Sequence, residues 1–362
     1  MPATAAAGWP KSPAHASRRR STATRATAVE TADFRPARWL GNPHLQSVLA
    51  SHRVRRWLRG ADLADLQRRA QHVVLDCGDG VRLQGWHNTA PGDTPARGLV
   101  VLLHGWEGSA QSSYLCNAAL TLGRKGFDVF RLEFRDHGEG QHLNPGLFHS
   151  CRIDEVVGAV GAVAARWPTR PLLLAGFSLG GNFALRVALR APAAGIELAH
   201  VLAVCPAIDP ANVLVAMERA PWFYQQYFLL KWRRSLALKQ AAFPDLYDFG
   251  PWMRGLRLRA MTRELIVRYS EFDSLEAYLD GYSIAHDRLA GLTVPVTVLT
   301  SADDPIIPVS DFQALRLPDN ARLHIVGTGG HCGFLENWRL ESWAERFLLA
   351  TFEAAAPPVA AP

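Results

Sequence analysis

The chain of 362 residues contains no uninterrupted run of about 18 apolar residues, so the sequence predicts no membrane-spanning helix. It has only five cysteines, and none of them belongs to a Cys-x-x-Cys pair. That number and spacing indicate reduced thiols in a cytoplasmic protein rather than a disulfide framework or a zinc site. Hydrophobic residues make up 48% of the chain, which excludes a disordered protein and supplies enough apolar material for one large domain.

The net charge of +6 is unevenly distributed along the chain. Residues 1–72 contain 13 Lys and Arg but only 4 Asp and Glu, a net charge of +9, and the remaining residues carry a net charge of −3. A nucleic-acid-binding protein needs a basic face on its folded domain. The slightly acidic body therefore argues against a nucleic-acid partner.

The composition of the two ends predicts three regions. Residues 1–33 are rich in Ala, Ser, Thr, Pro and Arg and lack the apolar stretch of a secretion signal, so we expect a disordered basic leader. A cleaved targeting segment and a tether to an anionic surface are the alternatives for this leader. We expect a single domain over residues 34–353 and a disordered tail over residues 354–362.

Short apolar runs alternate with helical patterns through most of the chain. Two strands joined by a tight turn predict a hairpin over residues 72–87. Further strands are expected at 99–103, 128–132, 172–175, 201–204, 296–300 and 322–326. Helices are expected between them, at 112–124, 152–166, 179–190, 308–316 and 337–351. Apolar strands that alternate with helices predict an α/β fold, in which helices cover both faces of a mostly parallel sheet.

The alternation stops once, over about residues 210–292, where no clear strand occurs. Within this segment Trp222–Trp252 has ten aromatics in 31 residues. We interpret it as an inserted helical cap whose aromatics pack on the main domain. The alternative is that residues 221–234 lie on a membrane surface, with aromatic side chains at the interface.

A GxSxG motif, Gly176-Phe177-Ser178-Leu179-Gly180, follows one of the predicted strands and precedes a predicted helix. In this context the motif is typical of a nucleophile elbow, a sharp turn that presents a serine at the end of a strand. Side chains two residues either side of the serine would collide in such a turn, which explains the two glycines. Ser178 is therefore the candidate nucleophile, at a helix N-terminus that favours developing negative charge.

A serine hydroxyl needs a general base, and the base needs a carboxylate to orient it. In α/β hydrolases the acid and then the histidine follow the serine along the chain. Asp303 and Asp304 come directly after the penultimate predicted strand, and His331 lies among glycines after the last strand. We prefer Asp304 as the acid because Pro305 favours an extended backbone before it, which leaves Asp303 as a turn or loop-capping residue. The predicted triad is Ser178, Asp304 and His331.

Acyl transfer also needs two backbone amides to bind the oxyanion. One candidate is the N–H of Leu179, directly after the nucleophile. The other is the N–H of Trp106, in the segment His104–Ser109 that follows the strand at 99–103. His104 is expected to hold this loop by hydrogen bonding rather than to transfer protons.

Two further segments suggest other chemistry only weakly. Residues 135–142 contain acidic and histidine side chains, but without the helical spacing or the cysteine partners of a metal site. The glycines at 327–330 open no helix with a phosphate-binding lysine. We therefore expect no metal and no cofactor.

The chain resembles the YheT-like branch of the α/β-hydrolase superfamily over about residues 34–350. The stretches that carry the likeness are Gly41–Ser47, His104–Ser109, Gly176–Asn182, Asp303–Pro305, Gly329–Phe334 and the segment Glu271–Ser283. The resemblance implies an α/β-hydrolase fold and hydrolysis of carboxylic or lipid esters by a Ser–Asp–His triad without a cofactor. The chain departs from the branch at Trp106, where an aliphatic residue is common.

These features predict a serine hydrolase of the cytoplasm that cleaves small-molecule carboxylic esters with medium or long acyl chains, as in lipid metabolism. An acyltransferase that uses the same acyl-enzyme is one alternative. A non-catalytic binding protein with the same fold is the other, but it would require a broken triad.

Overall fold

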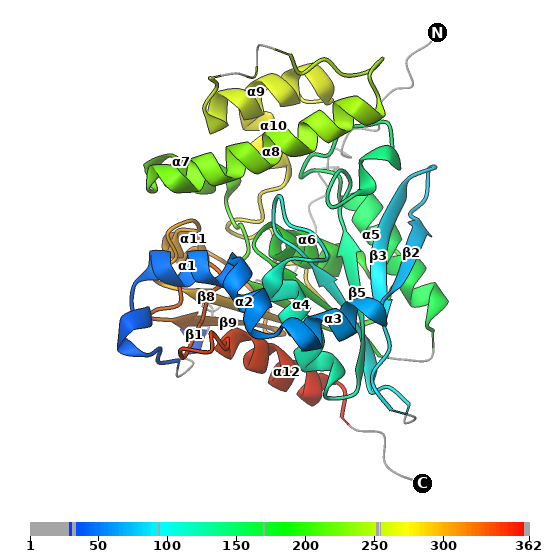
Figure 1. Cartoon of the computed structure of the whole chain (residues 1–362), viewed down its shortest axis with the longest axis vertical. Coiled ribbons are helices and arrows are strands. Elements are labelled where there is room, and N and C mark those ends of the chain that lie inside the picture. Colours follow the sequence, from blue (N-terminus) through cyan, green and yellow to red (C-terminus); the bar gives the residue numbers. More distant parts are fainter. Residues whose placement is uncertain are drawn as a thin grey trace, which may run out of the picture.

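The computed structural model describes residues 29–30, 34–92, 95–168, 171–250, 253 and 255–357. They form a nine-stranded sheet in the order β1-β9-β8-β7-β6-β4-β5-β3-β2 (Figure 1). The strands are β1 (Val29–Glu30), β2 (Gln71–Asp76), β3 (Arg82–Asn88), β4 (Gly98–Leu103), β5 (Phe127–Glu133), β6 (Leu172–Phe177), β7 (Leu198–Val204), β8 (Val296–Ser301) and β9 (Ala321–Val326). Only β3 pairs antiparallel, with β2 and β5. The predicted hairpin and mostly parallel sheet are confirmed.

Helices cover both faces of this sheet. α5 (Ile153–Arg166) and α6 (Leu179–Arg190) pack together on one face, and α3 (Gly60–Arg68), α4 (Ser113–Gly123) and α12 (Trp343–Ala355) cover the other. The central strand β4 shows why two layers are needed. Leu99, Val101 and Leu103 contribute to one buried cluster, whereas the alternate residues Val100 and Leu102 contribute to the second. Successive side chains of a strand point to opposite faces, so a strand without polar residues must be covered twice.

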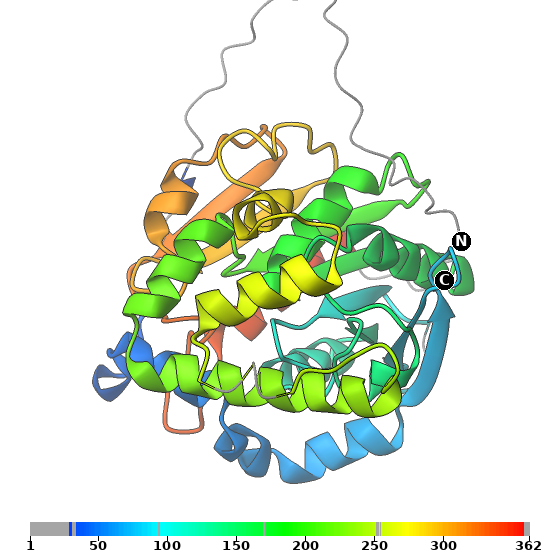
Figure 2. The same ribbon diagram turned by 90° about the horizontal axis from the view of Figure 1, so that it is seen from above.

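The described residues between β7 and β8 include the helices α7 (Pro210–Arg219), α8 (Trp222–Ala242), α9 (Leu258–Tyr269) and α10 (Leu275–Gly281), which lie at the carboxyl end of the sheet. Seen from above, α8 and α9 lie across the sheet (Figure 2). We refer to α7–α10 as the cap. None of the helices in the described part of the chain is long and apolar enough to cross a bilayer.

One cap side chain is fully buried against the main domain. Lys239 of α8 donates to the Asp136 carboxylate (2.7 Å) and to three carbonyl oxygens, those of Gln141, Asn144 and Gly146. A buried ammonium group is tolerated only when its donors are satisfied, as they are here. This contact fixes the C-terminal half of α8 to the segment after β5.

The remaining short elements precede or connect the main ones. They are the 3₁₀ helices η1 (Arg38–Leu40) and η2 (Gly140–His142), and the helices α1 (Pro43–Ser51), α2 (Arg53–Leu58) and α11 (Val309–Gln313). α1 begins after Asn42, whose side chain accepts from the amides of His44 and Leu45 and so caps the helix.

The structure differs from the predicted boundaries mainly at the last helix and at the N-terminal end of the fold. The last helix starts at Trp343 rather than at 337, because Leu335 and Ser342 pair as an isolated bridge and close the chain between them into a turn. The same helix extends to Ala355, two residues into the predicted tail. Most of the predicted leader lies outside the described residues, but Val29–Glu30 form β1 at the edge of the sheet beside β9.

Candidate active site

Ser178 lies in the tight turn between β6 and α6, with a backbone conformation that few non-glycine residues adopt (φ 55°, ψ −120°). A Cβ atom at Gly176 would lie 2.0 Å from the carbonyl oxygen of Gly180, and one at Gly180 would lie 2.5 Å from that of Leu103. Both contacts are far below van der Waals distance, so the turn requires both glycines. The serine hydroxyl is thereby held at the carboxyl end of the central strands.

The structure brings the three residues of the predicted triad together. The Ser178 hydroxyl lies 2.9 Å from Nε2 of His331, and Nδ1 of the same ring lies 2.8 Å from Oδ2 of Asp304. The other oxygen of Asp304 accepts from the amides of Ile306 and Ile307, and the carboxylate is fully buried. Because Asp304 accepts at Nδ1, that nitrogen carries the proton of the neutral ring, and Nε2 can then accept from the serine.

Asp303 has a different partner. Its Oδ1 accepts from the amide of Gly330 at 2.9 Å, directly before His331. The two neighbouring aspartates therefore hold one loop at two points, Asp304 through the imidazole ring and Asp303 through the backbone. This matches the loop-capping role expected of Asp303.

The loop after β4 leaves one amide free near the serine. The N–H of Gly105 donates to the Tyr114 hydroxyl and that of Glu107 to His137, whereas Gly108 donates within the loop to Gly105. The N–H of Trp106 has no acceptor among the described residues. Leu179 is the first residue of α6, where an amide has no acceptor within the helix. The N–H groups of Trp106 and Leu179, which we predicted from the sequence as oxyanion donors, are therefore available to an oxyanion.

Two buried histidines hold this loop in place. Nε2 of His104 accepts from the Phe134 amide, and Nδ1 donates to the carbonyl oxygen of Gly105. Burial, with a smaller effect of the neighbouring histidine, lowers the pKa of His104, and burial lowers that of His137 to about 4. Both rings are therefore neutral at pH 7 and can accept from backbone amides. His104 supports the loop as predicted, and His137 is a support that the sequence did not reveal.

The histidine loop is held from the other side by α1. The Ser47 hydroxyl accepts from the amide of His331 (2.8 Å) and donates to Pro43. Gln46 is fully buried, donates to Leu40 and Leu335, and accepts from the amide of Leu335. The stretch Gly41–Ser47, one of those that carry the family resemblance, therefore positions the candidate base, a role that no motif indicated.

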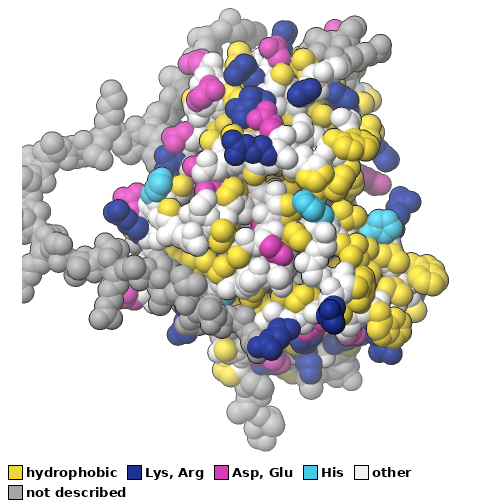
Figure 3. Space-filling view, turned by 90° about the vertical axis from the view of Figure 1, so that its left-hand side faces the viewer, with side chains coloured by type: hydrophobic (Ala, Val, Ile, Leu, Met, Phe, Trp, Pro, Cys, Tyr) yellow, Lys and Arg dark blue, Asp and Glu magenta, His cyan; other side chains and the backbone are white. Residues whose placement is uncertain are grey.

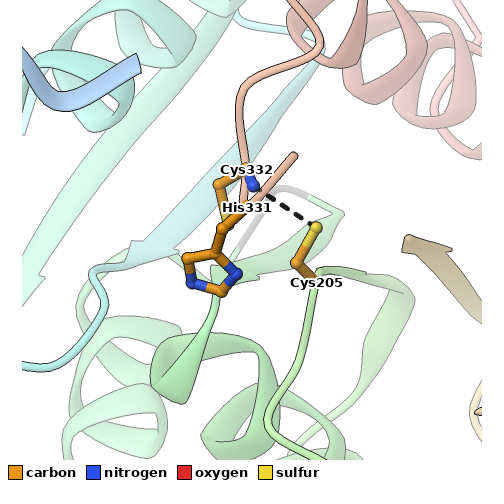
Figure 4. A group of neighbouring side chains, drawn as sticks. All are labelled: Cys205, His331 and Cys332. Carbon is orange, nitrogen blue, oxygen red and sulfur yellow. Dashed lines mark hydrogen bonds between the residues drawn. The ribbon is translucent and has the colours of Figure 1, made fainter. Parts of the chain in front are cut away.

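Cys205 and Cys332 lie beside the same histidine (Figure 4). Sγ of Cys205 accepts from the amide of Cys332 at 3.4 Å, and ligand atoms of Cys205, His331 and Cys332 lie within 4.8 Å of one another. Both ring nitrogens of His331 are already bonded to Ser178 and Asp304. Neither nitrogen is left to bind a metal, and we assign no metal to the cluster.

A cavity of about 860 Å³ opens above Ser178 and His331, between the main domain and the cap. Cap residues supply much of an apolar wall, and those that line it include Val213, Leu214, Met217, Leu265, Ile266 and Leu279. This volume is in the range of small-molecule sites. The cavity can accommodate an extended aliphatic chain next to the serine.

The cap also contacts the oxyanion loop directly. The Trp106 ring stacks on Phe228 of α8 (5.2 Å between centroids, 12° between planes) and meets Trp232 edge-on. Lys231 of the same helix donates to the carbonyl oxygen of Glu107 at 2.6 Å. The aromatic side chain at 106, which departs from the pattern of the resembled branch, is therefore matched by an aromatic face on α8.

The charge of the candidate base depends on its neighbours. Burial lowers the pKa of His331, but the Asp304 carboxylate, the Cys332 thiol and the hydrogen bond to Asp304 together outweigh it and raise this pKa to about 9. An imidazolium is thus stabilised strongly in this site. This is the species that forms when a histidine takes the proton of an attacking serine.

Comparison with known proteins places these residues in a family. Residues 94–337 match the family described as serine aminopeptidase, S33, over about two thirds of the chain. The chain belongs to this hydrolase family. The match contains Ser178, Asp304 and His331, and with the fold it identifies the protein as a member of the α/β-hydrolase superfamily.

Individual relatives agree with this family. The hydrolase is 26% identical to human protein ABHD15, over 90% of the chain and 69% of that protein. It is 23% identical to mouse phospholipase ABHD3 over 67% of the chain, which spans 60% of that protein's length. Its structure resembles the esterase Pf2001 of Pyrococcus furiosus, with a TM-score of 0.52 and 16% identity over 81% of this chain and 93% of that one. At this identity the structural likeness shows the shared fold.

Proposed function

We propose that this protein is a serine esterase that cleaves carboxylic esters of medium- or long-chain acyl groups. The observation that carries the proposal is the continuous hydrogen-bond chain from Ser178 through His331 to Asp304, beside two free amides and an apolar cavity. Ester hydrolysis in general is also supported by the hydrolase family and by the phospholipase relative. The triad and the acyl preference are the finer parts of the proposal.

The mechanism follows from the donors and acceptors around Ser178. Nε2 of His331 takes the hydroxyl proton while Oγ attacks the ester carbonyl, and Asp304 stabilises the resulting imidazolium. The N–H groups of Trp106 and Leu179 bind the negative oxygen of the tetrahedral intermediate. The imidazolium then protonates the leaving alcohol, and a water activated by the same histidine releases the acid.

The acyl preference rests on the apolar wall of the cap. Burial of each additional methylene group favours binding by roughly 0.8 kcal/mol, so a cavity lined by aliphatic side chains selects longer acyl chains until it is filled. We therefore propose that the acyl chain lies against the cap helices α7, α9 and α10.

We test the proposal with p-nitrophenyl esters of two to sixteen carbons (roughly the span that such a cavity can sample), followed by product analysis in water and with added alcohol or thiol acceptors. The expected result is release of free acid, with kcat/KM rising from acetate to medium or long chains, and labelling of Ser178 by a fluorophosphonate. Acyl transfer to the added acceptor in preference to water would favour the acyltransferase. An inert Ser178 and no turnover would favour the binding protein.

Exposed side chains of α8 suggest where the protein meets its substrate. Trp222 and Tyr227 are 75% and 48% exposed, and Tyr227 also lines the cavity. Hydrophobic side chains gather along the right-hand edge of the face seen in Figure 3. We propose that the exposed side chains of α8 make peripheral contact with lipid surfaces. We also propose a cytoplasmic location, in keeping with the five free thiols.

The raised pKa of His331 predicts an alkaline pH profile. Nε2 must be unprotonated to accept the serine proton, so in free enzyme with a pKa of about 9 only a minority of molecules are competent at pH 7. We expect kcat/KM to rise about tenfold per pH unit below that pKa and to level off above it. Released acid, quantified by chromatography between pH 6 and 10, measures the profile. A plateau that begins near the ordinary histidine pKa of about 6.5 would contradict the prediction.

A further inference from the structure

The cavity above Ser178 has fixed charges of only one sign. The arginine and lysine residues of its lining are Arg53, Arg56 and Lys231, and no aspartate or glutamate of the described residues lines it. Arg53 and Arg56 come from the basic stretch of residues 1–72, whereas Lys231 comes from residues 73–362, which carry a net charge of −3. The fold therefore brings cations from two distant segments of the chain to one cavity.

The side chains of Arg53, Arg56 and Lys231 have hydrogen-bond donors that remain available. Arg55, between the two arginines on α2, is buried in an ion pair with Glu345 (2.5 Å), whereas Arg53 and Arg56 have no carboxylate partner in the described part of the chain. Arg53 is exposed and Arg56 half-buried. Lys231 gives one hydrogen bond to Glu107, and an ammonium group has three donors. The three side chains can therefore bind an anion that enters the cavity.

The cations and the apolar wall lie on different sides of the cavity. Arg53 and Arg56 belong to α2, which packs with α1 and α4, whereas α7, α9 and α10 pack together within the cap. Figure 2 shows α8 between these groups, with α9 and α10 on one side and the blue N-terminal helices on the other. Lys231 lies on α8 itself. A ligand that filled the cavity would have one apolar and one anionic end.

We propose that the substrate is an acyl ester of an anionic alcohol, whose phosphate group is bound by Arg53, Arg56 and Lys231. The inference rests on the proposed esterase function and specifies its alcohol side. An acyl chain against the cap directs the alcohol towards α2, with the ester carbonyl at Ser178. Two guanidinium groups match the oxygen geometry of a phosphate, and a nearby ammonium adds charge.

Two short soluble esters test this proposal: hexanoyl glycerol and hexanoyl glycerol 3-phosphate, both used as monomers so that no lipid surface is involved. We expect the wild-type kcat/KM to be at least about tenfold higher for the phosphate ester, the size of one charged hydrogen bond. Arg53→Gln with Arg56→Gln should lower kcat/KM for the phosphate ester at least about tenfold more than for the neutral ester. The difference is expected mainly in KM. Free glycerol 3-phosphate should inhibit the wild type competitively.

Arg59→Gln is the matched control, because Arg59 lies at the end of α2 but does not line the cavity. It removes the same charge and should leave the preference for the phosphate ester unchanged. Cleavage of the neutral ester without a phosphate preference would overturn this inference and leave the esterase function standing. Cleavage of neither ester, nor of p-nitrophenyl esters, would overturn the proposed function itself. If the double variant lost only binding to anionic vesicles, the arginines would be a membrane contact and the inference would be wrong.

Discussion

Replacement of Ser178 by alanine is expected to lower kcat for ester hydrolysis by about 10⁴- to 10⁶-fold, as in serine proteases that lose the nucleophile. Oγ of Ser178 is the atom that we propose to attack the ester, and among the described residues Nε2 of His331 has no other hydroxyl as a hydrogen-bond partner. The amides of Trp106 and Leu179 remain, so a small residual rate above water is expected. Release of p-nitrophenol from a medium-chain ester measures the loss.

The variant should remain folded. Alanine keeps the Cβ atom of serine, so the unusual backbone at position 178 gains no new steric contact. Circular dichroism and thermal unfolding check this. His331→Ala should cause a similar loss, and the double variant should lose little more, because residues that act as a unit are strongly non-additive. Additive losses, or full activity of Ser178→Ala, would contradict the triad.

Much of the site could be predicted because its signals are local. The elbow needs Gly176 and Gly180 within two residues of Ser178, so five consecutive residues are enough to recognise this turn in the sequence. The acid and the base each follow an apolar strand, and parallel strands end at the same edge of a sheet. Sequence order and strand ends were therefore enough to bring together Ser178, Asp304 and His331.

The supports of the site were not predictable in the same way. Ser47 and Gln46 contact the histidine loop across about 285 positions of the sequence, and His137 contacts Glu107 from a different strand end. The sequence around a polar side chain does not indicate which distant amide it will form a hydrogen bond with. The boundary of α12 failed for a related reason, since a bridge between Leu335 and Ser342 overrides the helical pattern before Trp343.

The cap could be predicted in part. Its aromatic richness was visible in the sequence, but the partner of these aromatics was not. The structure pairs Phe228 and Trp232 with Trp106, next to the amide proposed for the oxyanion, while Lys239 fixes the other half of α8. A substrate that displaced α8 would also disturb the oxyanion loop. Cap shape and catalytic geometry are therefore expected to change together in variants of α8.

Replacement of Asp304 by asparagine is expected to lower kcat by about 10⁴-fold, the loss seen when the triad aspartate of a serine protease becomes asparagine. Asparagine can still accept from the amides of Ile306 and Ile307, so the turn should persist. Its amide group, however, can donate to Nδ1 of His331 and hold the ring in the wrong tautomer. The loss of negative charge should also lower the pKa of His331, since Asp304 raises it. The rising limb of the pH profile, which is set by this pKa, should move to lower pH.

Asp303→Asn is the matched control, one residue away with the same change of charge and size. Asp303 bonds to the amide of Gly330 rather than to the imidazole, and asparagine can still accept that bond. We expect its kcat to fall less than about tenfold, with little displacement of the pH profile. The two variants make the same chemical change at neighbouring positions, but only Asp304 bonds to the imidazole ring. Steady-state kinetics and pH profiles measured side by side therefore show which aspartate is the acid of the triad. A larger loss for Asp303→Asn than for Asp304→Asn would reassign the acid of the triad.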